Sequence, residues 1–250
     1  MPYSSGEIDI LSKAVLLRGL SEAELRAVIG EARIQRLADG AFFFMEAEPA
    51  EKAYILLEGK VKLGQVTEVG QQVILGYLIP GRVYGIISII KKITYPVSAQ
   101  AVGDCRALAW DQATMNRLMD AYPRMGLNAL HIMAGQIREF QNTIRDLSTK
   151  RVEQRIARAV LRLARQSGKK IEDGVLIDLP LTRQDLAEMT GTTLYTVSRV
   201  LTEWEAQGLV QSKRQRVVIC SPHGLVQIGE DLPGAAEPET RILGNDVCDL

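Results

Sequence analysis

The residues best suited to chemistry are a set of polar side chains that follows Gly191. The set combines hydroxyl groups, a phenol and a guanidinium, and its members are Tyr195, Thr196, Ser198, Arg199 and Thr202. An arginine can donate two parallel hydrogen bonds to O6 and N7 of guanine, and serine or threonine can contact any base edge. A basic turn, Lys-Arg-Gln-Arg at 213–216, suits the phosphates of a DNA backbone. The set is typical of residues that read a major groove.

Two helices separated by a glycine must position these side chains. Thr182 and Asp185 have the spacing of a capping box, which predicts a short helix over 182–189. Gly191 breaks the chain, and the threonine at 192 or 193 can cap a second helix that runs to about residue 207. On that helix, helical spacing predicts that five residues face the core: Leu194, Val197, Val200, Leu201 and Trp204.

The basic turn lies between two short apolar runs, at 209–210 and 217–219, which predict a β-hairpin. Helix, glycine turn, longer helix and basic hairpin in this order predict a winged helix-turn-helix. Residues 150–228 hold 13 Lys and Arg against 8 Asp and Glu, although the formal net charge of the chain is +0. The location of the basic charge, rather than its total, favours DNA as a partner.

Composition and cysteine spacing argue against several other classes of protein. The 250 residues, 46% of them hydrophobic, suit a globular protein of about two domains. Cys105, Cys220 and Cys248 form no CxxC pair, so neither a disulfide framework nor a metal cluster is indicated. A metal-dependent β-roll enzyme needs clustered histidines, and His131 and His223 both lie outside the strand-like region, so we expect no enzyme. Without a signal peptide or an apolar run of about 18 residues, we expect a cytoplasmic protein with no membrane partner.

The pattern from 41 to 111 changes to short strand-like runs separated by glycine. The runs are AFFFME, AYILLEG, VKLGQV, QVILGYLI, VSAQAVG and CRALAW. Many short strands with turn signals about every 8–12 residues predict a β-barrel or double-layer roll. Residues 1–39 instead predict short helices, one of them capped by Ser21.

Six apolar residues repeat with alternating spacings of three and four: Leu130, Met133, Ile137, Phe140, Ile144 and Leu147. This is the a/d pattern of a heptad repeat, and polar residues occupy most other positions. So narrow a seam, on a helix of about 40 Å, predicts a two-stranded coiled coil and therefore a homodimer. The alternative is a helix that packs on its own β-roll.

The expected fold is α+β: an N-terminal double-stranded β-helix of the jelly-roll kind, a long dimerisation helix and a C-terminal winged helix-turn-helix. Four parts follow from this pattern. They are a sensing β-roll with N-terminal helices (1–121), the dimerisation helix (122–149), the DNA-binding domain (150–228) and an acidic tail (229–250) that is expected to be disordered.

This order of elements resembles the CRP/FNR family of bacterial transcription regulators over roughly residues 15–228. The most specific pieces are PAEKAYILLEGKVKLGQ, LIPGRVYG and LTRQDLAEMTGTTLYTVSRVLTEWEAQGLV. The resemblance implies a homodimer that binds a palindromic promoter site and contacts RNA polymerase. In the family's recognition-helix pattern, Glu-x-x-Ser/Gly-Arg, this chain has Tyr195 at the Glu position and retains Ser198 and Arg199, so these three are expected to read bases. The expected phosphate contacts are Thr182, Arg183, Gln184, Thr193, Thr196, Lys213, Arg214 and Arg216.

The chain departs from the family's effector patterns. Cyclic-AMP-binding members hold the ribose with a Glu after a roll glycine and neutralise the phosphate with an Arg eleven residues beyond that glycine. Here Gly85 is followed by Ile86, and Pro96 occupies the Arg position. A cyclic phosphate would lack its bidentate cation, so we do not expect cyclic AMP to be the effector. Iron–sulfur members need an N-terminal cysteine cluster that is missing, and the haem members' histidine position is Ile87.

The effector pocket that the resemblance implies consists of Tyr84, Gly85, Ile86, Ile87, Tyr95, Val97, Met133, Ile137 and Phe140. These residues predict an apolar pocket. Either a small apolar effector binds there, or the pocket is filled by its own side chains. No cofactor is expected, although a haem- or gas-sensing member of the family and a ligand-binding module that no longer binds DNA are the alternatives.

Overall fold

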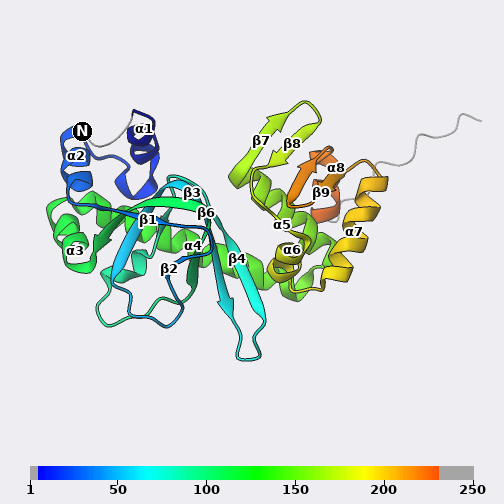
Figure 1. The fold of residues 1–250 in the computed structure, drawn as a ribbon, viewed down its shortest axis with the longest axis horizontal. Coiled ribbons are helices and arrows are strands. Elements are labelled where there is room, and N and C mark those ends of the chain that lie inside the picture. The colour runs from blue at the N-terminus through cyan, green and yellow to red at the C-terminus, as the bar shows by residue number, and fades with distance from the viewer. Residues whose placement is uncertain (1–4, 231–250) are drawn as a thin grey trace, which may run out of the picture.

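The structure, a computed structural model, describes residues 5–230, which form two lobes joined by a long helix (Figure 1). The first lobe begins with α1 (Ser5–Lys13), a 3-10 turn η1 (Val15–Leu17) and α2 (Glu22–Gly30). The predicted cap of α2 is confirmed. The Ser21 hydroxyl accepts a hydrogen bond from Glu24 N at 3.3 Å, and Glu24 Oε2 accepts one from Ser21 N at 2.7 Å.

The strands of this lobe form the predicted β-roll. They are β1 (Arg33–Leu37), β2 (Phe42–Phe44), β3 (Lys52–Val66), β4 (Gln72–Leu78), β5 (Val83–Tyr84) and β6 (Ser98–Asp111). Their antiparallel order is β1-β6-β3-β4, with β2 also on β6 and β5 on β3. The expectation that 33–37 belongs to a helical region was wrong. This segment becomes a strand because it pairs with β6, a partner about seventy residues away that local spacing does not reveal.

Two long strands replace four of the short runs that were expected. The register of β3 against β6 shifts on both sides of Glu58, so the strand bends there and continues to Val66. At Gly59 the backbone is left-handed, with φ at +83°, and an added Cβ would lie 2.4 Å from the carbonyl oxygen of Asp104. The glycine therefore marks a bend within a strand, where the sequence pattern indicated the end of one.

Two helices follow the roll, α3 (Gln112–Ala121) and α4 (Pro123–Thr149). The beginning of α4 packs on the roll, where Met125 and Ala129 are fully buried. Asn128 also connects α4 to η1, since its amide donates to the carbonyl oxygens of Leu16 at 3.0 Å and Arg18 at 2.9 Å. The rest of α4 passes behind the roll toward the second lobe (Figure 1). The alternative of a helix packed on its own roll thus describes only the first turns of α4.

The second lobe is the predicted winged helix-turn-helix, so the predicted fold class is confirmed. Its helices are α5 (Val152–Ser167), α6 (Arg183–Thr190), α7 (Leu194–Ala206) and α8 (Pro222–Glu230). Its sheet has the order β7-β8-β10-β9, from β7 (Gly168–Ile171), β8 (Gly174–Ile177), β9 (Val210–Lys213) and β10 (Arg216–Ile219). Gly229 and Glu230, expected in the tail, end α8, and the remainder of the acidic tail lies outside the described residues.

The two lobes contact each other through strand β4. Ile74 and Tyr77 of that strand are buried in the same apolar cluster as the inward faces of α5, α6 and α7. Burial, and then the carboxylates of Asp185 and Glu188 on α6, raise the pKa of the Tyr77 hydroxyl. Beside this contact, Lys60 Nζ of the roll lies 3.3 Å from Asp178 Oδ1 of the second lobe. Strand β4 of the roll is therefore part of the apolar core of the second lobe.

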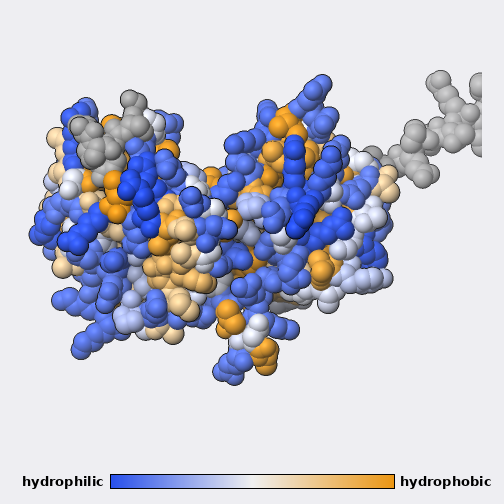
Figure 2. Space-filling view, in the orientation of Figure 1, coloured by the Kyte–Doolittle hydropathy of each residue, from blue (hydrophilic) through white to orange (hydrophobic). Residues whose placement is uncertain are grey.

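Some apolar side chains remain on the surface. The hairpin between β3 and β4 projects from the lower edge of the molecule, and its tip exposes Val66 and Val69 (Figure 2). A second apolar group lies along α4. Its side chains are between 46% and 64% exposed, and they are Leu130, Ile137, Phe140, Ile144 and Leu147. No helix within residues 5–230 is both long enough and apolar enough to cross a membrane. Within residues 5–230 of one copy, about half of the α4 group's surface thus remains uncovered.

Candidate nucleic-acid interface

The turn between α6 and α7 has caps at both ends. Thr182 caps α6: its hydroxyl accepts from Asp185 N at 3.0 Å, and Asp185 Oδ2 accepts from Thr182 N at 2.8 Å. Gly191, with φ at 60°, ends α6 in the left-handed region, where glycine is favoured. Thr193 caps α7 by accepting from Thr196 N at 3.2 Å. The predicted capping residues are confirmed, and Thr193 rather than Thr192 is the second cap.

Helix α7 buries one side and presents another. Val197, Val200, Leu201 and Trp204 lie in the apolar cluster of the lobe, as predicted. Leu194 was expected there too, and this was wrong, because its side chain is 48% exposed. It is the first residue of the helix and stands at the turn itself, one helical turn before the buried stripe begins. The buried stripe orients the rest of the helix, so its polar residues must point outward.

Four of the predicted polar residues share one outward face. Tyr195, Ser198, Arg199 and Thr202 are spaced i, i+3, i+4 and i+7, which places them on one side of a helix. Tyr195 is 77% exposed, and the guanidinium of Arg199 forms only long ion pairs. Its nitrogens lie 3.8 Å from a carboxylate oxygen of Glu153 and 4.0 Å from one of Glu203. Exposed ion pairs of this length contribute little, so Arg199 is available to another partner.

The wing lies beside this face as a two-stranded hairpin. Lys213 pairs with Arg216 across β9 and β10, and Gln215 turns the chain with φ at 58°. Lys213, Arg214 and Arg216 are all exposed, and none forms an ion pair with another residue of 5–230. The predicted hairpin is confirmed, and it presents three free cations next to α7.

A hydrogen-bond network that sequence inspection missed connects the wing to both helices. Ser212 of β9 donates to Glu205 Oε1 of α7 through its backbone N at 2.7 Å and its hydroxyl at 2.6 Å. Arg183 of α6 donates from Nη2 to the same hydroxyl at 2.9 Å. Only the tertiary fold brings these three residues together, so no local spacing could have indicated the network. It fixes the wing relative to the turn and engages Arg183 within the protein.

The other expected phosphate contacts surround the start of each helix. The hydroxyls of Thr182 and Thr193 already cap the two helices, and the Thr196 hydroxyl lies 2.9 Å from that of Thr193. Gln184 is exposed, and its amide donates to Glu188 Oε1 at 2.8 Å. Thr182 and Gln184 thus lie at the start of α6, whereas Thr193 and Thr196 lie at the start of α7.

The interior of the β-roll is filled by aromatic rings. Tyr84 and Tyr95, both expected to line an effector pocket, are buried among Phe43, Phe44 and Tyr54. Phe44 stacks on Tyr95 with ring centroids 3.8 Å apart, and Tyr54 stacks on Tyr84 at 5.0 Å. The Tyr95 hydroxyl also donates to the carbonyl oxygen of Lys52 at 2.8 Å. Rings therefore occupy the space where the sequence predicted an apolar pocket.

The structure does not bring all nine expected pocket residues together. Ile87 and Val97 border the aromatic cluster, whereas Ile86 and Met133 belong to the apolar core beneath α3 and α4. Gly85 turns the chain between these clusters with φ at +67°, where an added Cβ would lie 2.6 Å from the carbonyl oxygen of Lys52. Ile137 and Phe140 lie on the exposed side of α4. Among residues 5–230, no three His, Cys, Asp or Glu side chains are grouped so as to hold a metal ion.

Comparisons with known proteins match both lobes. The model of the Crp-like helix-turn-helix domain matches residues 154–228, and that of the cyclic nucleotide-binding domain matches residues 34–122. The CRP-like cAMP-activated global transcriptional regulator of Mycobacterium tuberculosis is 24% identical over 88% of this chain and 98% of its own length. The global nitrogen regulator of Synechocystis sp. is 27% identical over 74% of this chain and 83% of its own. FixK2 from Bradyrhizobium japonicum has a similar fold, with a TM-score of 0.69 at 22% identity over 82% of this chain and 99% of its own.

Proposed function

Because the chain belongs to the CRP/FNR family of transcription regulators, we propose that it works as a homodimer that binds a palindromic promoter site and contacts RNA polymerase. The chain then has the four parts that its sequence pattern indicates. A β-roll with its N-terminal helices comprises residues 1–121, a dimer helix 122–149, a DNA-binding domain 150–228 and an acidic tail 229–250.

The observation that carries this function is the outward face of α7. A tyrosine, a serine and a loosely paired arginine project from the first two turns of a helix whose other side is buried. A helix-turn-helix inserts this part of its second helix into the major groove. Tyr195, Ser198 and Arg199 then contact base edges, while the wing cations contact phosphate.

The exposed stripe on α4 supports a homodimer. Five of the six seam residues are about half exposed, and Met133 alone packs against the core of its own lobe. A second α4 helix would cover the stripe by knobs-into-holes packing. Two copies related by a two-fold axis present two α7 helices to the same side, which suits a palindromic site.

The test of the proposed function is selection of binding sites from random DNA by the purified chain. We expect an enriched palindrome, each half of which contains a guanine that Arg199 reads. A gel shift with the DNA upstream of the chain's own gene should then show competition by the selected site. Enrichment of no sequence, with no shift at low salt, would contradict the proposal and favour a ligand-binding module without DNA affinity.

We predict that the chain does not bind cyclic AMP. Ile86 is buried in the core at the position where a carboxylate would hold the ribose, and Pro96 replaces the cation for the phosphate. Tyr84 and Tyr95, stacked on their neighbours, occupy the roll interior as well. Calorimetry with millimolar cyclic AMP should therefore detect no binding. Saturable binding in the micromolar range would mean that another residue supplies the missing cation.

A further inference from the structure

A cavity of about 470 Å³ lies where the two lobes meet. Its walls come from the loop between β4 and β5, the C-terminal half of α4, the outer side of α5 and the end of α8. Small-molecule sites in proteins span about 300–1,000 Å³ and are favoured at interfaces between domains. The cavity thus has the size and the position of a ligand site.

Four arginines converge on this cavity: Arg82, Arg158, Arg162 and Arg165. Arg158 is already paired, since Nε lies 2.9 Å from Asp146 Oδ2 and Nη1 lies 2.6 Å from Glu230 Oε1. Within residues 5–230, the guanidinium groups of the other three form no ion pair or hydrogen bond. With Glu139, the wall holds four arginines and three carboxylates, which leaves a net excess of one positive charge.

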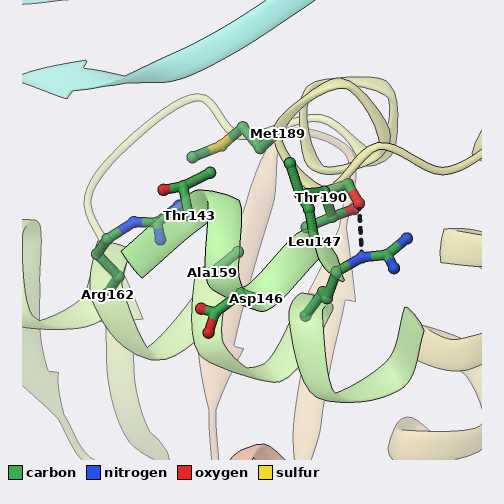
Figure 3. A pocket seen from close by; sticks show the side chains of 8 residues that line it. Thr143, Asp146, Leu147, Ala159, Arg162, Met189 and Thr190 are labelled. Atoms are coloured by element: carbon green, nitrogen blue, oxygen red, sulfur yellow. Dashed lines mark hydrogen bonds between the residues drawn. The ribbon is translucent and has the colours of Figure 1, made fainter. Parts of the chain in front are cut away.

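Arg162 is the most informative of the four. Burial is the main cause that lowers the pKa of its guanidinium, and the carboxylates of Glu139 and Asp146 offset this only in part. Figure 3, a view of the narrow cleft next to the cavity, shows Arg162 beside Thr143, while the Asp146 carboxylate points away. A largely buried guanidinium without a hydrogen-bonding partner is costly. Such a group is poised to bind an anion, since five donors in a planar fork match phosphate oxygens.

Dimer formation would leave the cavity open. The α4 residues of its wall are Glu139, Asn142 and Asp146. They occupy positions c, f and c of the heptad whose a and d positions form the seam, so they face away from a partner helix.

We propose that this cavity binds a small phosphate-bearing molecule through Arg82, Arg162 and Arg165. The bound molecule would contact the loop after β4, α4 and α5 together and so hold the two lobes in one arrangement. This site goes beyond the proposed function and does not depend on DNA binding.

The test is calorimetry of the full chain with pyrophosphate and with ADP as probes, and adenosine as the control without phosphate. We expect saturable binding of at least one of the two phosphate probes and none of adenosine. Arg162→Gln and Arg82→Gln should each weaken that binding at least about tenfold, because each removes a charge-assisted hydrogen bond. Arg82 is exposed, so its variant keeps the test valid if Arg162→Gln does not fold.

Two matched variants locate the binding. Arg36→Gln removes an exposed charge from β1, and Lys213→Gln removes one from the wing; both should bind the probe as the unaltered chain does. If Lys213→Gln loses binding and the cavity variants keep it, the anion binds at the DNA interface and the proposal is wrong. It is also wrong if neither phosphate probe binds, or if all four variants are weakened alike.

Discussion

Replacing both Ile137 and Ile144 with aspartate is expected to split the dimer into monomers. The two residues are successive a positions, 56% and 63% exposed in one copy of the chain, on the stripe that a second α4 would cover. In a dimer the substitution would bury four facing carboxylates without partners. Each unpaired buried charge costs several kcal/mol even after relaxation, which exceeds what most coiled-coil dimers can lose. Sedimentation velocity at micromolar concentration measures the outcome.

A matched control keeps this test specific. Arg138 and Arg145 are exposed b positions on the same helix, outside the a/d seam. Arg138→Asp with Arg145→Asp changes the charge of the helix more than the seam variant does and should leave the dimer intact. Circular dichroism should show that both variants keep their helices. An intact dimer for the isoleucine variant would mean that the interface lies elsewhere, and that the α4 stripe serves another partner.

The second large effect concerns the guanidinium of Arg199. If it donates to O6 and N7 of one guanine, Arg199→Ala should cost about 1–3 kcal/mol on the best binding site. The preference at that base pair should flatten too, because the group that distinguishes guanine from adenine is gone. Little is lost in the free protein, where Arg199 pairs only at 3.8 and 4.0 Å with exposed glutamates. Fluorescence anisotropy on the selected site and on a site altered at one base pair measures both effects.

Lys213→Ala is the matched comparison, since it also removes one exposed cation, but from the wing. A contact with phosphate carries no sequence information, so this variant should weaken binding to all sequences alike. The slope of log K against log salt should fall in magnitude by roughly one. If Lys213→Ala changed the selected sequence while Arg199→Ala left it intact, the reading and anchoring roles would be reversed.

Local signals in the sequence predicted the second lobe well. Thr182, Gly191 and Thr193 cap their helices through contacts within a few residues, and the buried stripe of α7 follows from helical spacing. Such contacts are encoded where they occur along the chain. The same reasoning placed Leu194 in the core, because spacing defines a face and does not show where along the helix the neighbouring elements end.

The first lobe was harder because its strands pair across long distances. Residues 33–37 become a strand only because β6 is available, and Gly59 continues a strand that glycine usually ends. The aromatic filling of the roll was hard to predict in detail for the same reason. The rings that fill it come from Phe43, Phe44 and Tyr54 on β2 and β3, and no spacing around Tyr84 or Tyr95 indicates them. The Arg183–Ser212–Glu205 network likewise depends on tertiary contacts.

The burial of Ile74 and Tyr77 against the winged helix stabilises one relative placement of the two lobes. Any arrangement that swings the second lobe away from β4 exposes these side chains to water. Exposing one large apolar side chain costs about 1.5–3 kcal/mol. The exposure of Ile74 alone therefore lowers the population of the open arrangement by a factor on the order of 10–100. DNA or a ligand shifts this balance only by as much as it binds one arrangement better than the other. The contact with β4 thus determines how much binding energy a regulatory signal must deliver.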